Sequence, residues 1–194
     1  MLFRRKHEFK PDKISSGALN KLYITPKQRQ AMLKWLLMAA FLVFVGVVQD
    51  VIFSRVTLFG ATFDLMAVAL LLSCILLDPE IGSIFLLIAS MFYWFSGSAP
   101  GPYVIGLLTV LGVFFAIVRH CYLHDTFGSV LFCTGAALLL YEAAIFGIGL
   151  FMGYTTLSRW DGHAIKVAIS LAAVPLMYPV FVSIGKIGGK EWND

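Results

Sequence analysis

The sequence predicts an all-helical integral membrane protein in which six transmembrane helices form one bundle. Of the 194 residues, 59% are apolar and only 13% are charged, whereas soluble domains carry about 25% charged residues. Glycine, proline and charged residues break the apolar sequence into segments of helical length, without the alternation of a membrane β-barrel. A chain of this length has room for about six such spans.

Capping and helix-breaking residues predict where each helix begins and ends. Thr25 and Pro26 suit the N-cap and first position of a helix, and Gln28 completes a capping box. The turn at 78–82 separates the second helix from the third, and the Gly/Pro cluster at 96–102 separates the third from the fourth. The predicted helices cover about residues 25–49, 63–77, 79–95, 102–118, 126–152 and 164–185.

The basic residues predict the orientation of the bundle. With six spans, 12 of the 15 Lys and Arg residues lie on the side of the two termini, and Arg55, Arg159 and Lys166 lie on the other. Because cytoplasmic loops are enriched in Lys and Arg, both termini are expected to be cytoplasmic.

The same pattern divides the chain into three parts. A basic arm over residues 1–29 is expected to lie in the cytoplasm or at the membrane interface, where it attracts anionic lipids rather than nucleic acid. The transmembrane domain covers residues 30–187, and a short cytoplasmic tail covers 188–194.

Glu142 is a carboxylate near the middle of the fifth predicted helix, in the segment LLLYEAAIFG. Its insertion into the bilayer costs about 2.5 kcal/mol or more. Gly128, Gly135 and Gly149 share a seven-residue spacing with it, and Gly153 forms a GxxxG pair with Gly149. Such a stripe allows another helix to approach closely, so Glu142 is expected on a helix-packing face and not toward lipid.

Three roles for Glu142 follow from this placement: a neutral packing residue, a contact to a partner's helix, or a ligand or proton site. In the first, Glu142 packs on the sixth helix, where Ala164, Ala168 and Ala172 form a small-residue face. The protonated Glu142 then donates a hydrogen bond to a backbone carbonyl that the kinks at Pro175 and Pro179 leave free. In this case Glu142→Gln is expected to be nearly harmless. The last role is less favoured, because proton relays use further acids within the membrane.

Two other polar residues are expected to order the outer half of the bundle. Asp64 opens the second helix, where a carboxylate is favoured by the helix dipole. Gln49 lies at the outer end of the first helix.

Several aromatic residues gather at the outer ends of the predicted helices. An interfacial aromatic belt is the favoured interpretation, and a pocket for a small molecule is the alternative. The pocket residues would be Tyr93, Trp94, Tyr103, Tyr154 and Trp160.

No catalytic or metal site is predicted. His120 and His124 have the spacing of metal ligands on a helix, with Cys121 between them, but no second ligand cluster accompanies them. Ser96 and Ser98 lie in a Gly/Pro turn without the histidine that a serine nucleophile needs. The cysteines are isolated and are expected to be free thiols.

Five short motifs between residues 32 and 185 together resemble the family of the rod shape-determining protein MreD. They are VVQDVIF with Gln49, GATFDLMAV with Asp64, PGPYVIGLLTVLG, VRH with Arg119, and the Tyr141-Glu142 pair. The chain departs from the family at Phe63, where proline is usual, and at the end of the third helix (MFYWFSG), where an acidic residue is usual.

The resemblance implies a non-catalytic scaffold without a cofactor in the bacterial cytoplasmic membrane. The implied partner is the bitopic protein MreC, within the cell-wall elongation complex that also holds RodA, a class B penicillin-binding protein and MreB. The implied fold is similar to the S components of energy-coupling factor transporters. That similarity supplies the alternative function, a membrane subunit that binds a vitamin-like small molecule.

Overall fold

The computed structural model describes residues 26–53, 63–97, 99–124 and 126–187, which are helical without any strand in these ranges. Four of the helical segments are long and apolar enough to cross a membrane: Arg29–Phe53, Tyr103–Tyr122, Phe127–Phe151 and Leu157–Gly185. The chain is therefore a helical membrane protein. The expectations for the arm before Pro26, the Thr25 cap, Arg55 and the tail at 188–194 lie outside the described residues.

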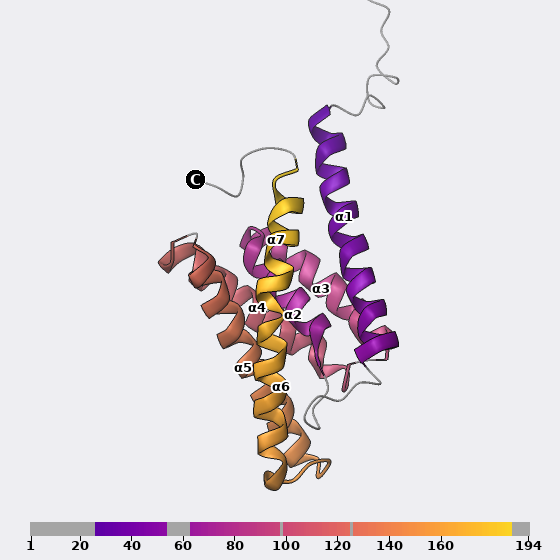
Figure 1. Ribbon diagram of the computed structural model, residues 1–194, viewed down its shortest axis with the longest axis vertical. Coiled ribbons are helices and arrows are strands. Elements are labelled where there is room, and N and C mark those ends of the chain that lie inside the picture. Colours follow the sequence, from indigo (N-terminus) through magenta and orange to yellow (C-terminus); the bar gives the residue numbers. More distant parts are fainter. Residues whose placement is uncertain (1–25, 54–62, 98, 125, 188–194) are drawn as a thin grey trace, which may run out of the picture.

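The helices follow one another with short connections (Figure 1). In chain order they are α1 (Pro26–Val48), the π-helical turn η1 (Gln49–Phe53), α2 (Leu65–Leu76), α3 (Pro79–Phe95), α4 (Tyr103–Tyr122), α5 (Phe127–Phe151), the 3₁₀ turn η2 (Leu157–Arg159), α6 (Trp160–Ala172) and α7 (Val174–Gly185). The first five predicted helices agree with these bounds to within a few residues.

The sixth predicted helix differs from the structure in two ways. It begins at Trp160, one turn earlier than expected, and it breaks at Ala173 into α6 and α7. Pro175 lies in the first turn of α7 and causes the break, because proline lacks an N–H and its ring excludes the carbonyl four residues earlier. The early start adds His163 to the helix, one turn before Lys166, whose charge was counted on the outer side of the membrane.

α2 is the central helix of the bundle. All twelve of its residues are buried, and it contacts α1, α3, α4, α5, α6 and α7. Figure 1 shows these helices arranged around it, with the start of α1 and the end of α7 at the same end of the bundle. α2 is apolar on all sides except for the Ser73 hydroxyl, and its complete burial places it inside the bundle, away from water and lipid.

α2 is too short to cross the bilayer by itself, because twelve residues span only about 18 Å of a core about 30 Å thick. Its two ends therefore lie among other helices, where side chains satisfy the backbone. At the C-terminal end, Nη1 of Arg119 donates a hydrogen bond of 2.6 Å to the Ile75 carbonyl. The prediction of six crossings is not decided by helix length, because α2 and α3 are both shorter than a usual span.

The packing of α4 on the central helix depends on Gly112. A Cβ atom at this position would collide with the Leu86 side chain and would contact Cys74 of α2. Both neighbours are fully buried, so a larger side chain forces them to move.

Gly112→Leu is expected to lower the free energy of unfolding by about 1–3 kcal/mol, as overpacking of a filled core does. Gly106 on the same helix is the matched control, because nothing lies within 4 Å of a Cβ built there. Gly106→Leu should change stability by less than about 0.5 kcal/mol. Unfolding in mixed micelles measures both, and equal effects of the two substitutions would contradict this account of the α4 contact.

Candidate functional site: a buried charge cluster

Asp64, which was expected to open the second helix, forms the N-cap of α2. Its Oδ1 accepts a hydrogen bond of 3.0 Å from the Ala67 amide, which satisfies one of the free N–H groups of the first turn. The carboxylate also accepts from the hydroxyl of Tyr93 on α3, at 3.1 Å to Oδ1 and 3.2 Å to Oδ2. The backbone N–H of Asp64 donates to Oγ of Ser170 on α6 at 3.3 Å.

Gln49 holds the chain that enters α2. Its Nε2 donates to the Phe63 carbonyl at 2.6 Å, and its Oε1 accepts from the Leu65 amide at 2.9 Å. Gln49 is buried at the start of the π-helical turn η1, where the widened turn brings its side chain to α2. One amide side chain thus joins the end of the first helix to the start of the central one.

Glu142 is paired with Lys166, which the orientation prediction counted on the outer side of the bundle. Nζ of Lys166 lies 2.7 Å from Oε1 of Glu142 and 3.7 Å from Oδ2 of Asp64. The Glu142 side chain is 1% exposed and that of Lys166 is 19% exposed. Lys166 therefore bridges two buried carboxylates, one from α5 and one from the cap of α2.

His163 completes the cluster from the first turns of α6. Its Nδ1 lies 3.8 Å from Oε2 of Glu142, and its side chain is 27% exposed. The imidazole ring also packs on Phe146 of α5, with ring centroids 4.6 Å apart in a T-shaped arrangement. We call Asp64, Glu142, His163 and Lys166 the charge cluster.

The inward face of α6 is polar, which corrects the predicted packing of this helix. His163, Lys166 and Ser170 recur at helical spacing and point to α2 and α5. The expected small-residue face is on the other side, since Ala164, Ala168 and Ala172 are all exposed. The helical spacing of the three polar residues was the signal that could have identified Lys166 and His163 from sequence.

The predicted hydrogen bond from a protonated Glu142 to a backbone carbonyl is also wrong, because the structure gives Glu142 a different partner. The carboxylate faces the Lys166 ammonium and not a carbonyl freed near Pro175 or Pro179. Glu142→Gln is therefore no longer expected to be harmless, because it removes the nearest counter-charge of a lysine that is largely buried.

The glycines spaced by seven around Glu142 do not form one packing seam within this chain. Gly135 is in contact with α6, where a Cβ would lie 3.2 Å from Leu171 Cδ1. Gly128 is exposed with open space around it, and Gly149 faces Thr155 of the following connection. Gly153 has a φ of 75° and ends the helix in a left-handed conformation, which is a different role from a GxxxG contact.

The five aromatic residues predicted as an alternative ligand pocket do not converge. Tyr93 is buried against Asp64, whereas Tyr154 is 80% exposed and Trp160 is 55% exposed. Trp94 is exposed at the end of α3, and Tyr103 is half-buried at the start of α4.

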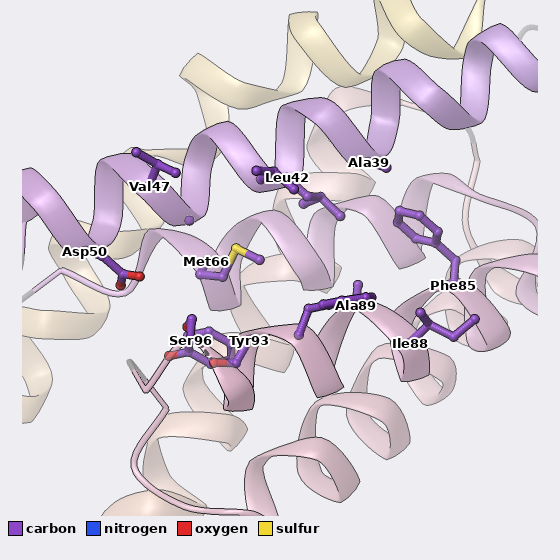
Figure 2. Close-up of a pocket in the computed structure, with 13 residues that line it drawn as sticks. Ala39, Leu42, Val47, Asp50, Met66, Phe85, Ile88, Ala89, Tyr93 and Ser96 are labelled. Carbon is purple, nitrogen blue, oxygen red and sulfur yellow. Dashed lines mark hydrogen bonds between the residues drawn. The ribbon is translucent and has the colours of Figure 1, made fainter.

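An apolar groove of about 410 Å³ lies instead between α1 and α3, and we call it the α1–α3 groove (Figure 2). Met66 of α2 forms its floor. Small residues on both sides leave the space open: Ala39 and Gly46 on α1, and Ala89 on α3. Asp50, Tyr93 and Ser96 lie near one end of the groove in Figure 2.

The remaining candidates from the sequence lie apart from the charge cluster, and of them only Ser96 lines the α1–α3 groove among the described residues. His120, Cys121 and His124 are exposed near the end of α4, and Ser96 lies just past the end of α3. No group of three or more His, Cys, Asp or Glu residues that could hold a metal ion occurs in the described ranges. The described cysteines are free, with Cys74 and Cys133 buried.

No family model, curated protein or solved structure matches this chain. The resemblance to the MreD family thus stays a prediction that depends on the quoted motifs.

Proposed function

We propose that this protein is a non-catalytic membrane scaffold that binds the transmembrane helix of a partner, in the manner of the MreD family that it resembles. The partner would be a bitopic protein similar to MreC, in the complex of the bacterial cytoplasmic membrane that builds the lateral cell wall. RodA, a class B penicillin-binding protein and MreB would be further members of that complex.

The α1–α3 groove is the observation that carries this proposal. Membrane helices associate through close packing, which requires small residues at the interface. Ala39, Gly46 and Ala89 supply them along the groove, between larger apolar residues that contact the sides of an inserted helix. The groove thus has the chemistry expected of a site for an apolar helix.

The charge cluster supports a scaffold in a second way. Lys166, Asp64 and Glu142 pair with one another, and Tyr93 and Ser170 bond to Asp64 and its backbone. These contacts join α2, α3, α5 and α6 into one unit, so the surface offered to a partner is held in one arrangement.

A topology with six crossings and cytoplasmic termini is part of the proposal. The two ends of the described bundle lie on the same side in Figure 1. Arg29, Arg119 and Lys186 lie toward that end by their positions in α1, α4 and after α7, which fits the cytoplasmic enrichment of basic residues.

Filling the groove is expected to release the partner. Ala89→Trp and, separately, Ala39→Trp should reduce recovery of an MreC-like protein at least tenfold when the tagged chain is purified from native membranes in mild detergent. Ala168→Trp is the matched control, because Ala168 is exposed on the lipid side of α6 and its replacement leaves the groove unchanged. Normal amounts of membrane-inserted variant establish that each chain folds.

Two outcomes would overturn the proposal. Recovery of the cell-wall proteins that is equal in all three variants would show that the groove does not hold the partner. Recovery of a pair of ATPases with a long-helix transport subunit would show that the chain is a transporter component that captures a small molecule.

A further inference from the structure

The charge cluster contains more negative than positive charge. Asp64 and Glu142 are two carboxylates, and Lys166 is the one lysine between them. Glu142 and Asp64 are both almost fully buried, at 1% and 4% exposure. A net negative charge at this depth is costly, so within the part of the chain that the structure describes the cluster lacks one positive charge.

The two carboxylates differ in how well they are satisfied. Asp64 accepts hydrogen bonds from the Ala67 amide and the Tyr93 hydroxyl, and it is close to Lys166. Among the described residues, Lys166 alone has a charged group close to Oε1 of Glu142, and the other oxygen, Oε2, faces His163 across 3.8 Å. The missing positive charge therefore belongs on the side of Glu142 and His163.

His163 is in a suitable place to supply that charge. Its ring is next to Oε2 of Glu142 on one side and packs on Phe146 on the other. An imidazolium would gain both an ion pair with the carboxylate and a cation–π contact with the phenyl ring. Its side chain is more exposed than that of Lys166 or Glu142 and lies in the first turns of α6, close to the connection from α5, so it is the member of the cluster most accessible from outside the bundle.

Other titratable groups near the cluster come from each element that packs around it. Tyr93 of α3 donates to Asp64, and the buried Tyr141 of α5 precedes Glu142 in the chain. Arg159 and Asp161 lie at the start of α6 and are exposed. Gln49 of η1 binds the backbone beside Asp64 and does not titrate. None of these described neighbours adds a buried positive charge.

We propose that the charge cluster is a proton-binding site, which takes up one proton from the aqueous phase onto His163, opposite Glu142. Proton uptake converts the neutral imidazole to an imidazolium and makes the cluster electrically neutral. It draws the first turns of α6 onto α5, and proton release leaves this contact with one unbalanced negative charge. The inference does not depend on the identity of any partner protein.

The test uses the full-length chain with His7, His120 and His124 replaced by glutamine, so that His163 is the sole histidine of the four in the sequence. The chain is labelled with ¹⁵N-histidine, placed in lipid nanodiscs, and followed by solid-state NMR from about pH 8 to about pH 5. The expected result is conversion of the neutral imidazole signal to that of the imidazolium. In the same background, Glu142→Gln should leave His163 neutral over this range, because Asp64 and Lys166 then balance each other.

Glu80→Gln is the matched control, since Glu80 is an exposed carboxylate at the start of α3, and it should titrate like the parent chain. Infrared spectra of the parent chain give a second measurement that needs no variant of Glu142. A protonated-carboxyl band that persists through the titration, with His163 neutral throughout, would overturn the proposal. Conversion of His163 that is identical with and without Glu142, or that depends on sodium instead of pH, would also overturn it.

Discussion

Replacing Lys166 with methionine is expected to lower the free energy of unfolding by about 3–5 kcal/mol, the cost of leaving buried charges without their partner. The ammonium lies 2.7 Å from Glu142 and 3.7 Å from Asp64, so its loss leaves two carboxylates facing each other in the bundle. Methionine has a similar shape, so the effect reports the charge and not a cavity. Unfolding of the purified protein in mixed micelles measures it.

Two further variants make this prediction specific to the charge cluster. Lys186→Met removes an exposed lysine at the end of α7 and should change stability by less than about 0.5 kcal/mol. Lys166→Met combined with Asp64→Asn and Glu142→Gln removes all three charges and should recover more than half of the loss. If Lys166→Met destabilises no more than Lys186→Met, the buried ion pairs are not what holds α6 to α5.

Asp64→Ala is expected to destabilise the protein by about 2–4 kcal/mol. Loss of the N-cap of α2 contributes about 1 kcal/mol. The Tyr93 hydroxyl loses its carboxylate acceptor in a buried place, which contributes about 1–3 kcal/mol more. Lys166 keeps Glu142 as its partner in this variant, so one ammonium stays opposite one carboxylate and the loss of Asp64 leaves neither without a counter-charge.

Asp64→Asn distinguishes the contribution of the capping hydrogen bond to stability from the contribution of the negative charge. Asparagine keeps an oxygen that can accept from the Ala67 amide and from Tyr93, so it should cost less than half as much as alanine. Asp78→Ala is the control, because Asp78 is at the N-cap position of α3 and its side chain makes no capping hydrogen bond. Equal losses in Asp64→Ala and Asp64→Asn would contradict the capping role and leave the charge as the cause.

Local signals were sufficient to predict most of the helical elements. Apolar segments between Gly, Pro and charged residues predicted α2 to α5 to within a few residues, because these breakers act on the backbone where they occur. The N-cap function of Asp64 was predictable for the same reason, since an N-cap bonds within its own first turn. The break at Ala173 was placed less well: proline kinks were expected near it, but not two separate helices.

The partners of the buried groups required the tertiary structure. A lone carboxylate is too costly in lipid, so the position of Glu142 within an apolar helical segment was enough to predict that it has a partner there. Only the packing of α5 on α6 decided that Lys166 and not a backbone carbonyl satisfies it. The rotation of a helix about its axis decides which of its residues face a neighbour, and neither apolar periodicity nor glycine spacing specified that rotation for α6, whose alanines face outward. The α1–α3 groove also required the tertiary structure, because its walls come from two helices that are placed relative to each other by their contacts with α2.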